Sequence, residues 1–328
     1  MTPIDTATNT ASTPIKVGIG PDYIAITPDG KIAYVANYGR DPARRPGTVT
    51  PIDTATNTAR PAIRVARRPV AIAITPNGKT AYVVSSPPAR YAVGTVTPIR
   101  IGTDTALRPI TVGRHPAAVA ITPNGKTAYV VNNGPGTVTP IRISTDTALK
   151  AITVGRHAIA IAITPNGKTA YVLSDFPGTV TPIRTATDTA LEPIRLAKDP
   201  IGIAITPDSK TAYVLSGHAV IPIRTATNTI AKAITIGPAL SGIAISPDGK
   251  TAYISHGFVG LVTPIDISAG SIRPAIKVGR GQGAIVLTPD GKTAYVLVNG
   301  NVVPIDTATG AALPMILVGG ASFIAITP

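Results

Sequence analysis

The chain has 328 residues, of which 44% are hydrophobic, 14% are charged and 4% are aromatic, and its formal net charge is +14. The absence of cysteine excludes disulfides, thiol catalysis, haem attachment through cysteine and cysteine-based zinc sites. No hydrophobic run reaches the roughly 18 residues of a membrane span, so no membrane insertion is expected. Trp is absent, so the core is expected to be aliphatic.

The first residues, Met1–Asp5, match the middle of a repeat that recurs along the chain, with Met1 where other copies have Val. They do not have the pattern of a signal peptide. We therefore expect the chain to be a fragment or trimmed form of a repeat protein, with any export signal outside it.

An Ile-Thr-Pro-(Asp/Asn)-Gly-Lys string recurs at intervals of 40 to 48 residues, with Ser209 replacing Gly in one copy and Ser246 replacing Thr in another, and a bare eighth copy ends at Pro328, 39 residues after the seventh. An Ala-Tyr-Val/Ile string follows it seven times. A Pro-Ile string at one fixed place in the repeat has eight copies, at Pro3, Pro51, Pro98, Pro140, Pro182, Pro222, Pro264 and Pro304. Such a period indicates a repeat architecture. The seven tyrosines are Tyr34, Tyr82, Tyr129, Tyr171, Tyr213, Tyr253 and Tyr295, and we expect them to be buried.

Each repeat predicts four short strands, shown by the third copy. Strand one is predicted at 118–122, and the Asn-Gly turn that follows tolerates the positive φ of a tight hairpin. Strands two, three and four are predicted at 127–131, 136–142 and 151–154, with a turn at 144–147 before the last. Four strands in about 40 to 45 residues, with no helical periodicity, are typical of a propeller blade.

These strings resemble the YVTN β-propeller repeat family, YncE-like repeat proteins of the actinobacterial surface or secreted type. The resemblance covers essentially the whole chain and implies one all-β propeller domain over residues 1–328. It implies a location outside the cell or at its surface. Related propellers include lactonases, virginiamycin B lyase and the haem d1 domain of a nitrite reductase, so fold alone does not decide function.

Closure of the ring has two solutions. The chain has seven copies of strand two but eight of the other three strands, because residues 304–328 repeat the content of 3–28. We predict a seven-bladed propeller of four-stranded antiparallel blades, with 1–20 and 304–328 as partial repeats involved in closure. The alternative is eight blades with an incomplete closing blade.

In a propeller of this kind, the loops after strands two and four emerge on one face, here called the top. All four histidines are predicted in top loops. Together with two aspartates they are candidates for general acid–base catalysis. The surrounding cations predict a basic anion-binding funnel, and two tyrosines in long loops (37–47 and 85–94) are candidates for stacking, with Phe176 and Phe258 behind them. The candidate catalytic residues are His115, His157, His218, His256, Asp175 and Asp199. The candidate ligand-binding residues are Arg67, Arg68, Arg114, Arg156, Lys198, Arg280, Tyr38 and Tyr91, with Arg40, Arg44, Arg45 and Arg90 in the long loops.

The opposite face carries a second pattern. The residue that ends strand three is Asp in four copies and Arg in four consecutive copies, and a Lys follows each hairpin turn. The arginines form a four-blade basic arc that either keeps the rim solvated or binds a polyanion. These arginines are Arg100, Arg142, Arg184 and Arg224.

The leading hypothesis is a non-enzymatic binding or scaffold propeller whose basic top face binds an anionic glycan, a cell-wall polymer or a protein. Nucleic acid is disfavoured because no aromatic residues interleave with the charges. No cofactor and no metal are expected, since carboxylates are sparse near the histidines. The alternatives are a lyase or lactone hydrolase with a His-containing site at the top centre, and a purely structural repeat fragment.

Overall fold

The computed structural model describes residues 1–41, 45–88, 92–281 and 283–328. The chain divides into two compact units, and each is considered by itself. The larger unit contains residues 15–195 and 327–328, and the smaller unit contains residues 1–14 and 196–326. The part of the chain that the structure describes contains no helix with the length and hydrophobicity needed to cross a membrane.

Every repeat starts with the same hairpin, because its Thr-Pro-Asx-Gly-Lys string satisfies its own polar groups. Thr27 donates its hydroxyl to a carboxylate oxygen of Asp29 at 2.6 Å, and the Lys31 amide donates to the same oxygen at 3.2 Å. Gly30 has φ +70°, a left-handed conformation that glycine adopts at little cost. The hairpin places strands one and two side by side.

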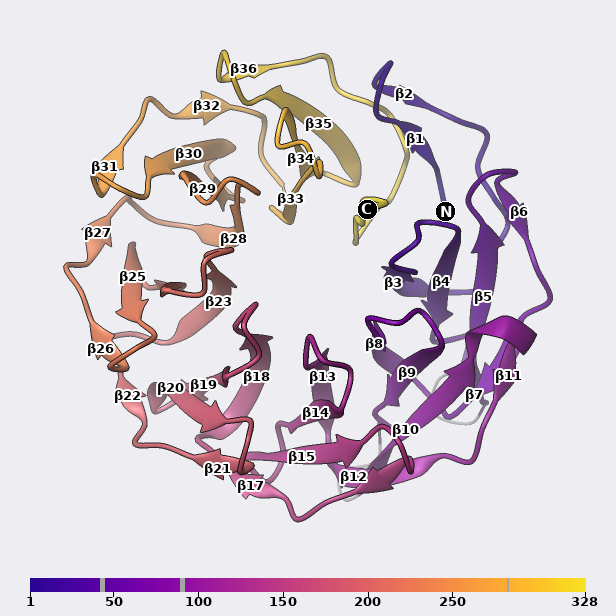
Figure 1. The fold of residues 1–328 in the computed structure, drawn as a ribbon. Helices are drawn as coiled ribbons and strands as arrows, with labels where there is room; N and C mark the ends of the chain where they lie inside the picture. The colour runs from indigo at the N-terminus through magenta and orange to yellow at the C-terminus, as the bar shows by residue number, and fades with distance from the viewer. Residues whose placement is uncertain (42–44, 89–91, 282) are drawn as a thin grey trace. The chain divides into compact units, whose positions relative to one another are not determined.

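The larger unit contains four antiparallel sheets, drawn in indigo to pink in Figure 1 and here called repeats 1 to 4. Repeat 1 has β3 (Pro21–Ile26), β4 (Ile32–Asn37), β5 (Gly47–Asp53), β6 (Thr58–Ala59) and β7 (Ile63–Val65). Repeat 2 has β8 (Pro69–Ile74), β9 (Thr80–Ser85), β10 (Val93–Arg100), the 3-10 turn η1 (Ile101–Thr103), β11 (Thr105–Ala106) and β12 (Ile110–Arg114). Repeat 3 has β13 (Pro116–Ile121), β14 (Thr127–Asn132), β15 (Thr137–Arg142), β16 (Thr147–Ala148) and β17 (Ile152–Thr153). Repeat 4 has β18 (Arg156–Ile163), β19 (Thr169–Phe176), β20 (Gly178–Arg184), β21 (Thr189–Ala190) and β22 (Ile194–Arg195).

The smaller unit contains three further sheets, repeats 5 to 7, and a two-stranded sheet of β1 (Ile4–Asp5) and β2 (Thr10–Ala11). Repeat 5 has β23 (Pro200–Ile205), β24 (Thr211–Ser216), β25 (Ala219–Arg224), β26 (Thr229–Ile230) and β27 (Ile234–Thr235). Repeat 6 has β28 (Leu240–Ile245), β29 (Thr251–His256), β30 (Leu261–Asp266), β31 (Ser271–Ile272) and β32 (Ile276–Lys277). Repeat 7 has β33 (Ile285–Leu287), β34 (Thr293–Val298), β35 (Asn301–Asp306) and β36 (Ala311–Ala312).

These sheets are blades of a β-propeller, which confirms the predicted fold class. The predicted fourth strand differs in detail. In repeat 3 it consists of two short strands, β16 and β17, which both pair with β15. The predicted turn at 144–147 therefore gives way to a strand at Thr147. Several other repeats have a proline in the break between the two pieces, and proline has no amide to donate to the ladder.

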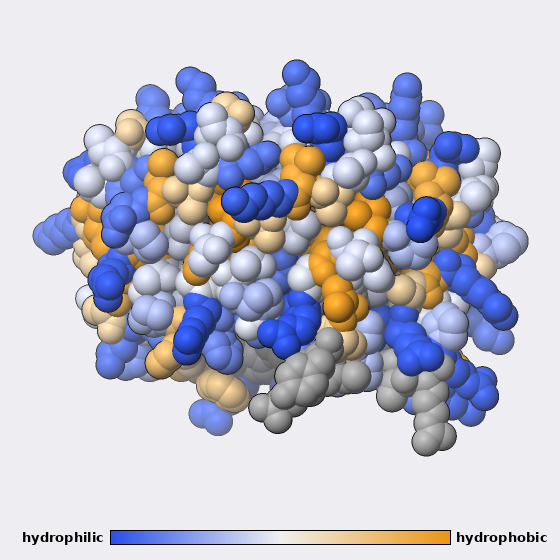
Figure 2. All heavy atoms as spheres, turned by 90° about the horizontal axis from the view of Figure 1, so that it is seen from below, coloured by the Kyte–Doolittle hydropathy of each residue, from blue (hydrophilic) through white to orange (hydrophobic). Residues whose placement is uncertain are grey.

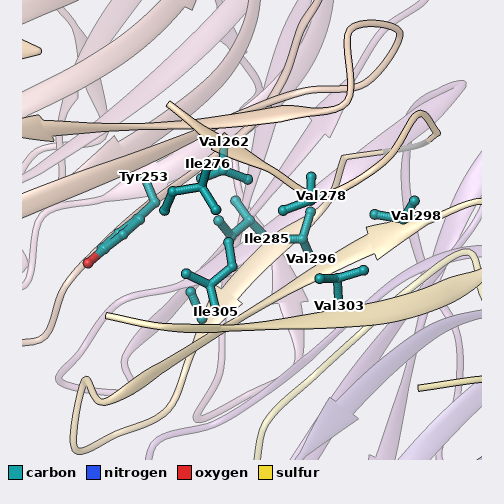
Figure 3. Close-up of a cluster of buried hydrophobic side chains, with 10 residues drawn as sticks. Tyr253, Val262, Ile276, Val278, Ile285, Val296, Val298, Val303 and Ile305 are labelled. Atoms are coloured by element: carbon teal, nitrogen blue, oxygen red, sulfur yellow. The ribbon is translucent and has the colours of Figure 1, made fainter. Parts of the chain in front are cut away.

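The core lies between neighbouring sheets. In the smaller unit, Val262 and Ile276 of repeat 6 pack against Val296 and Ile305 of repeat 7, as Figure 3 shows. Strand-two residues point into such clusters on both sides, which explains why strands such as β14 are apolar at nearly every position. Burial of each such Val or Ile contributes about 1.5 to 3 kcal/mol. The predicted burial of the repeat tyrosines is confirmed, since all seven are at most 5% exposed.

The strand-two tyrosines also connect successive blades. Tyr34 donates its hydroxyl to Asp104 of the next repeat at 2.6 Å, and Tyr82 donates to Asp146 at 2.6 Å. Tyr129 makes the same bond to Asp188. The acceptors have left-handed backbones, such as φ 49° at Asp104, a conformation that Asp and Asn tolerate better than most residues. Burial raises the pKa of these tyrosines, and the carboxylate partners raise it further.

Candidate binding surfaces

Each blade has two ends at which loops and turns carry charged and polar side chains. The loop edge is defined here as the residues just before strand one together with those between strands two and three. The turn edge is defined as the hairpin between strands one and two together with the turn after strand three. The predicted top-face residues belong to the loop edge, and the predicted basic arc belongs to the turn edge.

Two histidines and one arginine occupy the same strained position on the loop edge of the larger unit. Arg68, His115 and His157 each stand before the first residue of strand one or at its start, with φ of 51°, 49° and 52°. Repeat 1 has Gly20 at this position, with φ 65°. A non-glycine residue in this conformation costs of the order of 1 kcal/mol or more. Glycine would relax the backbone at this position, so the arginine and histidine side chains there have a local cost in backbone energy.

The other two histidines lie in the smaller unit and differ from each other. His218 is exposed in the turn between β24 and β25, and its carbonyl accepts the amides of Ile236 and Gly237. His256 was predicted in a loop, which is wrong: it is the last residue of β29 and only 4% exposed. Its Nδ1 lies 2.9 Å from the Pro238 carbonyl and its Nε2 lies 2.9 Å from the Thr263 hydroxyl. Both ring nitrogens therefore have structural partners.

The loop-edge cations of the larger unit are all exposed. Arg67 and Arg68 lie in the bend before β8. Three predicted loop positions are in strands instead, since Arg114 ends β12 and Arg156 and His157 begin β18. The ladder extends to them because Arg114 pairs with Val93 and Arg156 pairs with Phe176. Lys198 and Arg280 occupy bends of the smaller unit.

The candidate acidic residues belong to different units. In the larger unit, Asp175 lies in β19 rather than in a loop, and its Oδ1 is buried without a hydrogen-bond partner among the described residues. Asp22 lies in β3, where burial raises its pKa while Arg68 acts in the opposite direction. Asp199 is exposed in the smaller unit, just before β23. Within the described ranges, no group of three or more His, Asp or Glu residues is arranged to hold a metal ion.

The aromatic candidates have different surroundings. Tyr38 is 38% exposed and its ring covers Gly20, where a Cβ atom would lie 2.7 Å from the ring. Phe176 is 63% exposed and meets the His157 ring edge-on, with centroids 6.5 Å apart. Phe258 is 87% exposed in the turn after β29. Three predicted site residues lie outside the described residues: Arg44, Arg90 and Tyr91.

The turn edge differs in charge between repeats at two positions, of which only the strand-three position was predicted from the sequence. The Asx of the hairpin is Asp in repeats 1, 5, 6 and 7 but Asn in repeats 2, 3 and 4. Asn124 accepts the Thr122 hydroxyl at 2.7 Å and the Lys126 amide at 3.0 Å, the same bonds that Asp29 accepts in repeat 1. The two hairpins are thus equivalent in hydrogen bonding and differ in charge.

The hairpin lysines have different partners as a result. Where the hairpin has Asp, the Lys ammonium lies 3.7 to 3.9 Å from its carboxylate, as in the pair of Lys210 and Asp208. Lys79, Lys126 and Lys168 follow an Asn and have no ion pair within their hairpins. All three are exposed.

The residue that ends strand three changes in these three repeats and also in repeat 5. Asp53 and Asp266 each accept the amides of the second and third residues that follow. The pKa of Asp53 is lowered mainly by the Thr56 amide and that of Asp266 mainly by the Ser268 hydroxyl. In repeats 2 to 5 this residue is Arg, which has no acceptor for those amides. Arg100, Arg142 and Arg184 of the larger unit are exposed, and each pairs with the residue that follows a hairpin Lys.

The same turns keep one carboxylate each. Asp104, Asp146 and Asp188 accept the tyrosine hydroxyls described above, and Asp104 also pairs with Arg60 at 3.3 Å. The turn edges of repeats 2 to 4 therefore hold two cations and one carboxylate per repeat. Figure 2 shows hydrophilic side chains spread over the visible face, with hydrophobic residues in separate small patches between them.

Comparison with known proteins identifies the fold alone. No family model matches the chain, and no curated protein matches it. Among solved structures, hydrazine synthase from Kuenenia stuttgartiensis is similar with a TM-score of 0.70 and 22% identity, over 90% of this chain and 98% of that one. A functionally unknown protein from Desulfotomaculum acetoxidans is similar with a TM-score of 0.65 and 18% identity, over 84% of this chain and 90% of that one.

Proposed function

We propose that this chain is a non-enzymatic propeller that binds an anionic polymer, a carboxylated or sulfated glycan or a cell-wall polymer, through the edges of repeats 2 to 4. Membership of the YVTN repeat family and a location outside the cell or at its surface are part of this proposal. They are supported by the repeat strings quoted above.

One observation carries the proposal: arginine and histidine side chains occupy positions where the backbone favours another residue. On the loop edge, Arg68, His115 and His157 have left-handed conformations that glycine would relax. On the turn edge, Arg100, Arg142 and Arg184 stand where Asp elsewhere accepts two amides. A local cost that recurs at Arg68 and at three turn-edge arginines is explained if the positive charge of the arginines is used for binding, with the histidines as additional hydrogen-bond donors. Arginine is suited to this role because its planar fork binds carboxylate and phosphate groups with two hydrogen bonds.

Binding would be electrostatic in origin. The three successive sheets belong to one compact unit, so a flexible polymer has several cationic contacts within reach. Contacts of exposed charges are weak singly and add up along a polymer. The affinity is therefore expected to fall as salt rises, because the screening length shortens to about 8 Å at physiological ionic strength. Lys198 and Arg280 are proposed for the same role in the smaller unit.

The test measures binding of polygalacturonate and dextran sulfate, with neutral dextran as the reference polymer. The turn-edge variant combines Arg100→Asp, Arg142→Asp and Arg184→Asp, and the loop-edge variant combines Arg68→Gly, His115→Gly and His157→Gly. Both install the residue that another repeat uses at the same position, so both are expected to fold.

A control variant makes the same charge change elsewhere in the larger unit, with Arg64→Asp, Arg108→Asp and Arg195→Asp. Wild type is expected to bind both anionic polymers more tightly than dextran, and at least one edge variant is expected to weaken binding far more than the control. Equal binding of neutral and anionic polymers by wild type would refute the proposal. If all three variants lowered the affinity equally, net charge alone would explain the binding, and the assignment of the site to these edges would be wrong.

A further inference from the structure

Phenylalanine occupies different places in this chain from tyrosine. The seven repeat tyrosines are buried, whereas Phe176, Phe258 and Phe323 are 63%, 87% and 45% exposed. Phe176 belongs to the loop edge of repeat 4 and is the one phenylalanine in the sequence of the larger unit. Single exposed apolar side chains are common on protein surfaces, so the neighbours of Phe176 decide whether it can serve a ligand.

The backbone around Phe176 is part of a regular ladder. The first two strands of repeat 4, β18 and β19, have eight residues each, whereas those of repeat 3 have six. The added residues extend the ladder to the pair of Arg156 and Phe176, and Asp175 pairs with Gly178 of β20. The Phe176 ring is therefore presented from the end of a three-stranded ladder, which fixes the position of its backbone.

Arg156 stands beside Phe176 on the same face of the sheet. Residues that pair directly across two antiparallel strands have Cβ atoms about 4.5 to 5.5 Å apart on one face. Arg156 is exposed and has no ion pair within the described ranges. A cation and an apolar ring are thus neighbours, and both are accessible to a ligand.

His157 is the third member of this group, here called the repeat-4 cluster: Arg156, His157 and Phe176. The His157 ring meets the Phe176 ring edge-on, with centroids 6.5 Å apart. This arrangement is favourable because the positive edge of one ring meets the negative face of the other. It gives the side chain of His157 a contact that the glycine favoured by its left-handed backbone would lack. The imidazole is exposed, and even in its neutral form it has one N–H to donate.

Repeat 3 has the same two basic positions without the aromatic ring. Arg114 and His115 precede its first strand, but Gly134 stands in the place of Phe176. A Cβ atom at Gly134 would lie 3.0 Å from Cδ2 of His115, so that imidazole lies against bare backbone.

Repeat 6 shows the reverse combination. Phe258 stands in the place of Phe176, but Pro238 and Ala239 stand where repeat 4 has arginine and histidine. Its ring is 87% exposed and has no basic side chain at these two positions. Repeats 3 and 6 each contain one part of the repeat-4 cluster, and repeat 4 combines both parts.

We propose that the repeat-4 cluster is a subsite for one uronate residue of a carboxylated glycan, an inference that rests on the anionic-polymer binding proposed above. A uronate carries its carboxylate on the pyranose ring, so one sugar presents a flat C–H face and a negative charge side by side. The sugar C–H groups would lie against the negative face of the Phe176 ring. The Arg156 guanidinium would bind the carboxylate with two hydrogen bonds, and His157 would donate to a ring hydroxyl.

The cluster fits a uronate better than other anionic polymers. Sulfate esters stand on exocyclic oxygens around the sugar, where they separate the charge from the ring face. An acidic polypeptide carries its carboxylates on flexible stems that have no ring face beside the charge. The adjacent cation and ring of repeat 4 match a ligand that joins both features in one rigid unit.

The experiment measures binding of polygalacturonate and of poly-L-glutamate, which has carboxylates but no sugar ring. Phe176→Ala is expected to lower affinity for polygalacturonate about fivefold and to leave affinity for poly-L-glutamate close to that of wild type. Phe176→Tyr keeps the ring and is expected to bind polygalacturonate as wild type does. Phe258→Ala is the matched control, and it is expected to bind both polymers as wild type does. All three changes are at exposed positions, so melting temperatures are expected to stay close to that of wild type.

The outcomes separate this subsite from the proposed function. If wild type binds polygalacturonate and Phe176→Ala binds it equally well, the subsite is wrong and the proposed function stands. An equal loss for both polymers in Phe176→Ala would assign the ring to acidic chains in general, which overturns the uronate. An equal loss in Phe258→Ala would show that any exposed phenylalanine has the effect. A wild type that binds neither polymer would refute the proposed function and the subsite with it.

Discussion

The turn edges of repeats 2 to 4 and of repeats 6 and 7 have nearly the same backbone but opposite charge. In repeats 6 and 7 the hairpin and strand-three positions are both Asp, paired with one Lys, and the left-handed turn residue is Gly. In repeats 2 to 4 the same three positions are Asn, Arg and Asp. The hairpin hydrogen bonds are retained throughout, so the difference concerns charge rather than the fold.

The comparison shows that the surface charge of a blade can change while the hydrogen bonds that hold its turns stay the same. An amide and a carboxylate oxygen serve equally well as the hairpin acceptor, so that position is free to change charge. The strand-three position is less free, because the change from Asp to Arg removes an acceptor for two turn amides. Repeats 2 to 4 compensate in part, since the turn donates to the backbone, as Thr145 does to the Arg142 carbonyl at 3.4 Å.

The largest expected effect tests the charge of repeats 2 to 4 directly. The triple change of Arg100, Arg142 and Arg184 to Asp is expected to lower affinity for polygalacturonate about a hundredfold, because three charge contacts at about 1 kcal/mol each are lost. Thermal stability is expected to stay or rise, since each Asp would accept turn amides as Asp53 does. Fluorescence polarisation measures the affinity and a melting curve measures the stability. Unchanged affinity would show that the charge difference between the repeats does not affect binding.

The next prediction concerns the Asp at the left-handed turn position of repeats 2 to 4. Tyr82→Phe leaves Asp146 without its hydroxyl donor and is expected to destabilise the fold by about 1 to 3 kcal/mol. Tyr213 is the matched control, because its hydroxyl has no hydrogen bond within the described residues and Gly270 stands at the corresponding turn. Tyr213→Phe is expected to change stability by less than about 0.5 kcal/mol. Equal losses in urea denaturation would contradict this difference.

A smaller effect concerns the acid sensitivity of repeats 1, 6 and 7, in which strand three ends with Asp. Hydrogen bonds from turn residues hold the pKa of Asp53, Asp266 and Asp306 below the ordinary value, with Ser268 the largest contributor at Asp266. The stability that these groups add is therefore fully present above about pH 4 and is lost as the pH falls below it. Replacement of all three by Ala is expected to flatten the decrease in melting temperature below pH 4. Asp199→Ala is the control, and an unchanged acid decrease in the triple variant would count against the assignment.

The smallest effect tests the hairpin position alone. Asn124→Asp is expected to change stability by less than about 0.5 kcal/mol, because Asp accepts the same two hydrogen bonds. It gives Lys126 a carboxylate partner like that of Lys31, so affinity for the polyanion is expected to fall about threefold. A larger stability change would show that Asn and Asp are not interchangeable there.

The histidines show where sequence reasoning was limited. Position after Gly-Arg predicted both His115 and His157 in loops before strand one. This holds for His115, which stands just before β13, but His157 is the second residue of β18. Alignment of the repeats would also have shown that Gly20 shares their position. His256 was missed as a buried residue because histidine is more often a surface or site residue than a core residue. Its place at the end of strand two, where other repeats have Asn132 or Ser174, was the available signal for a polar residue inside the sheet.

The sequence by itself determined the repeat, the hairpins, the buried tyrosines and the propeller class, because each depends on residues close together in the chain. Only the tertiary structure showed that Tyr82 is connected to Asp146 of the next repeat and that His256 is buried. These features depend on which segments distant in the chain pack together, and local patterns do not contain that information.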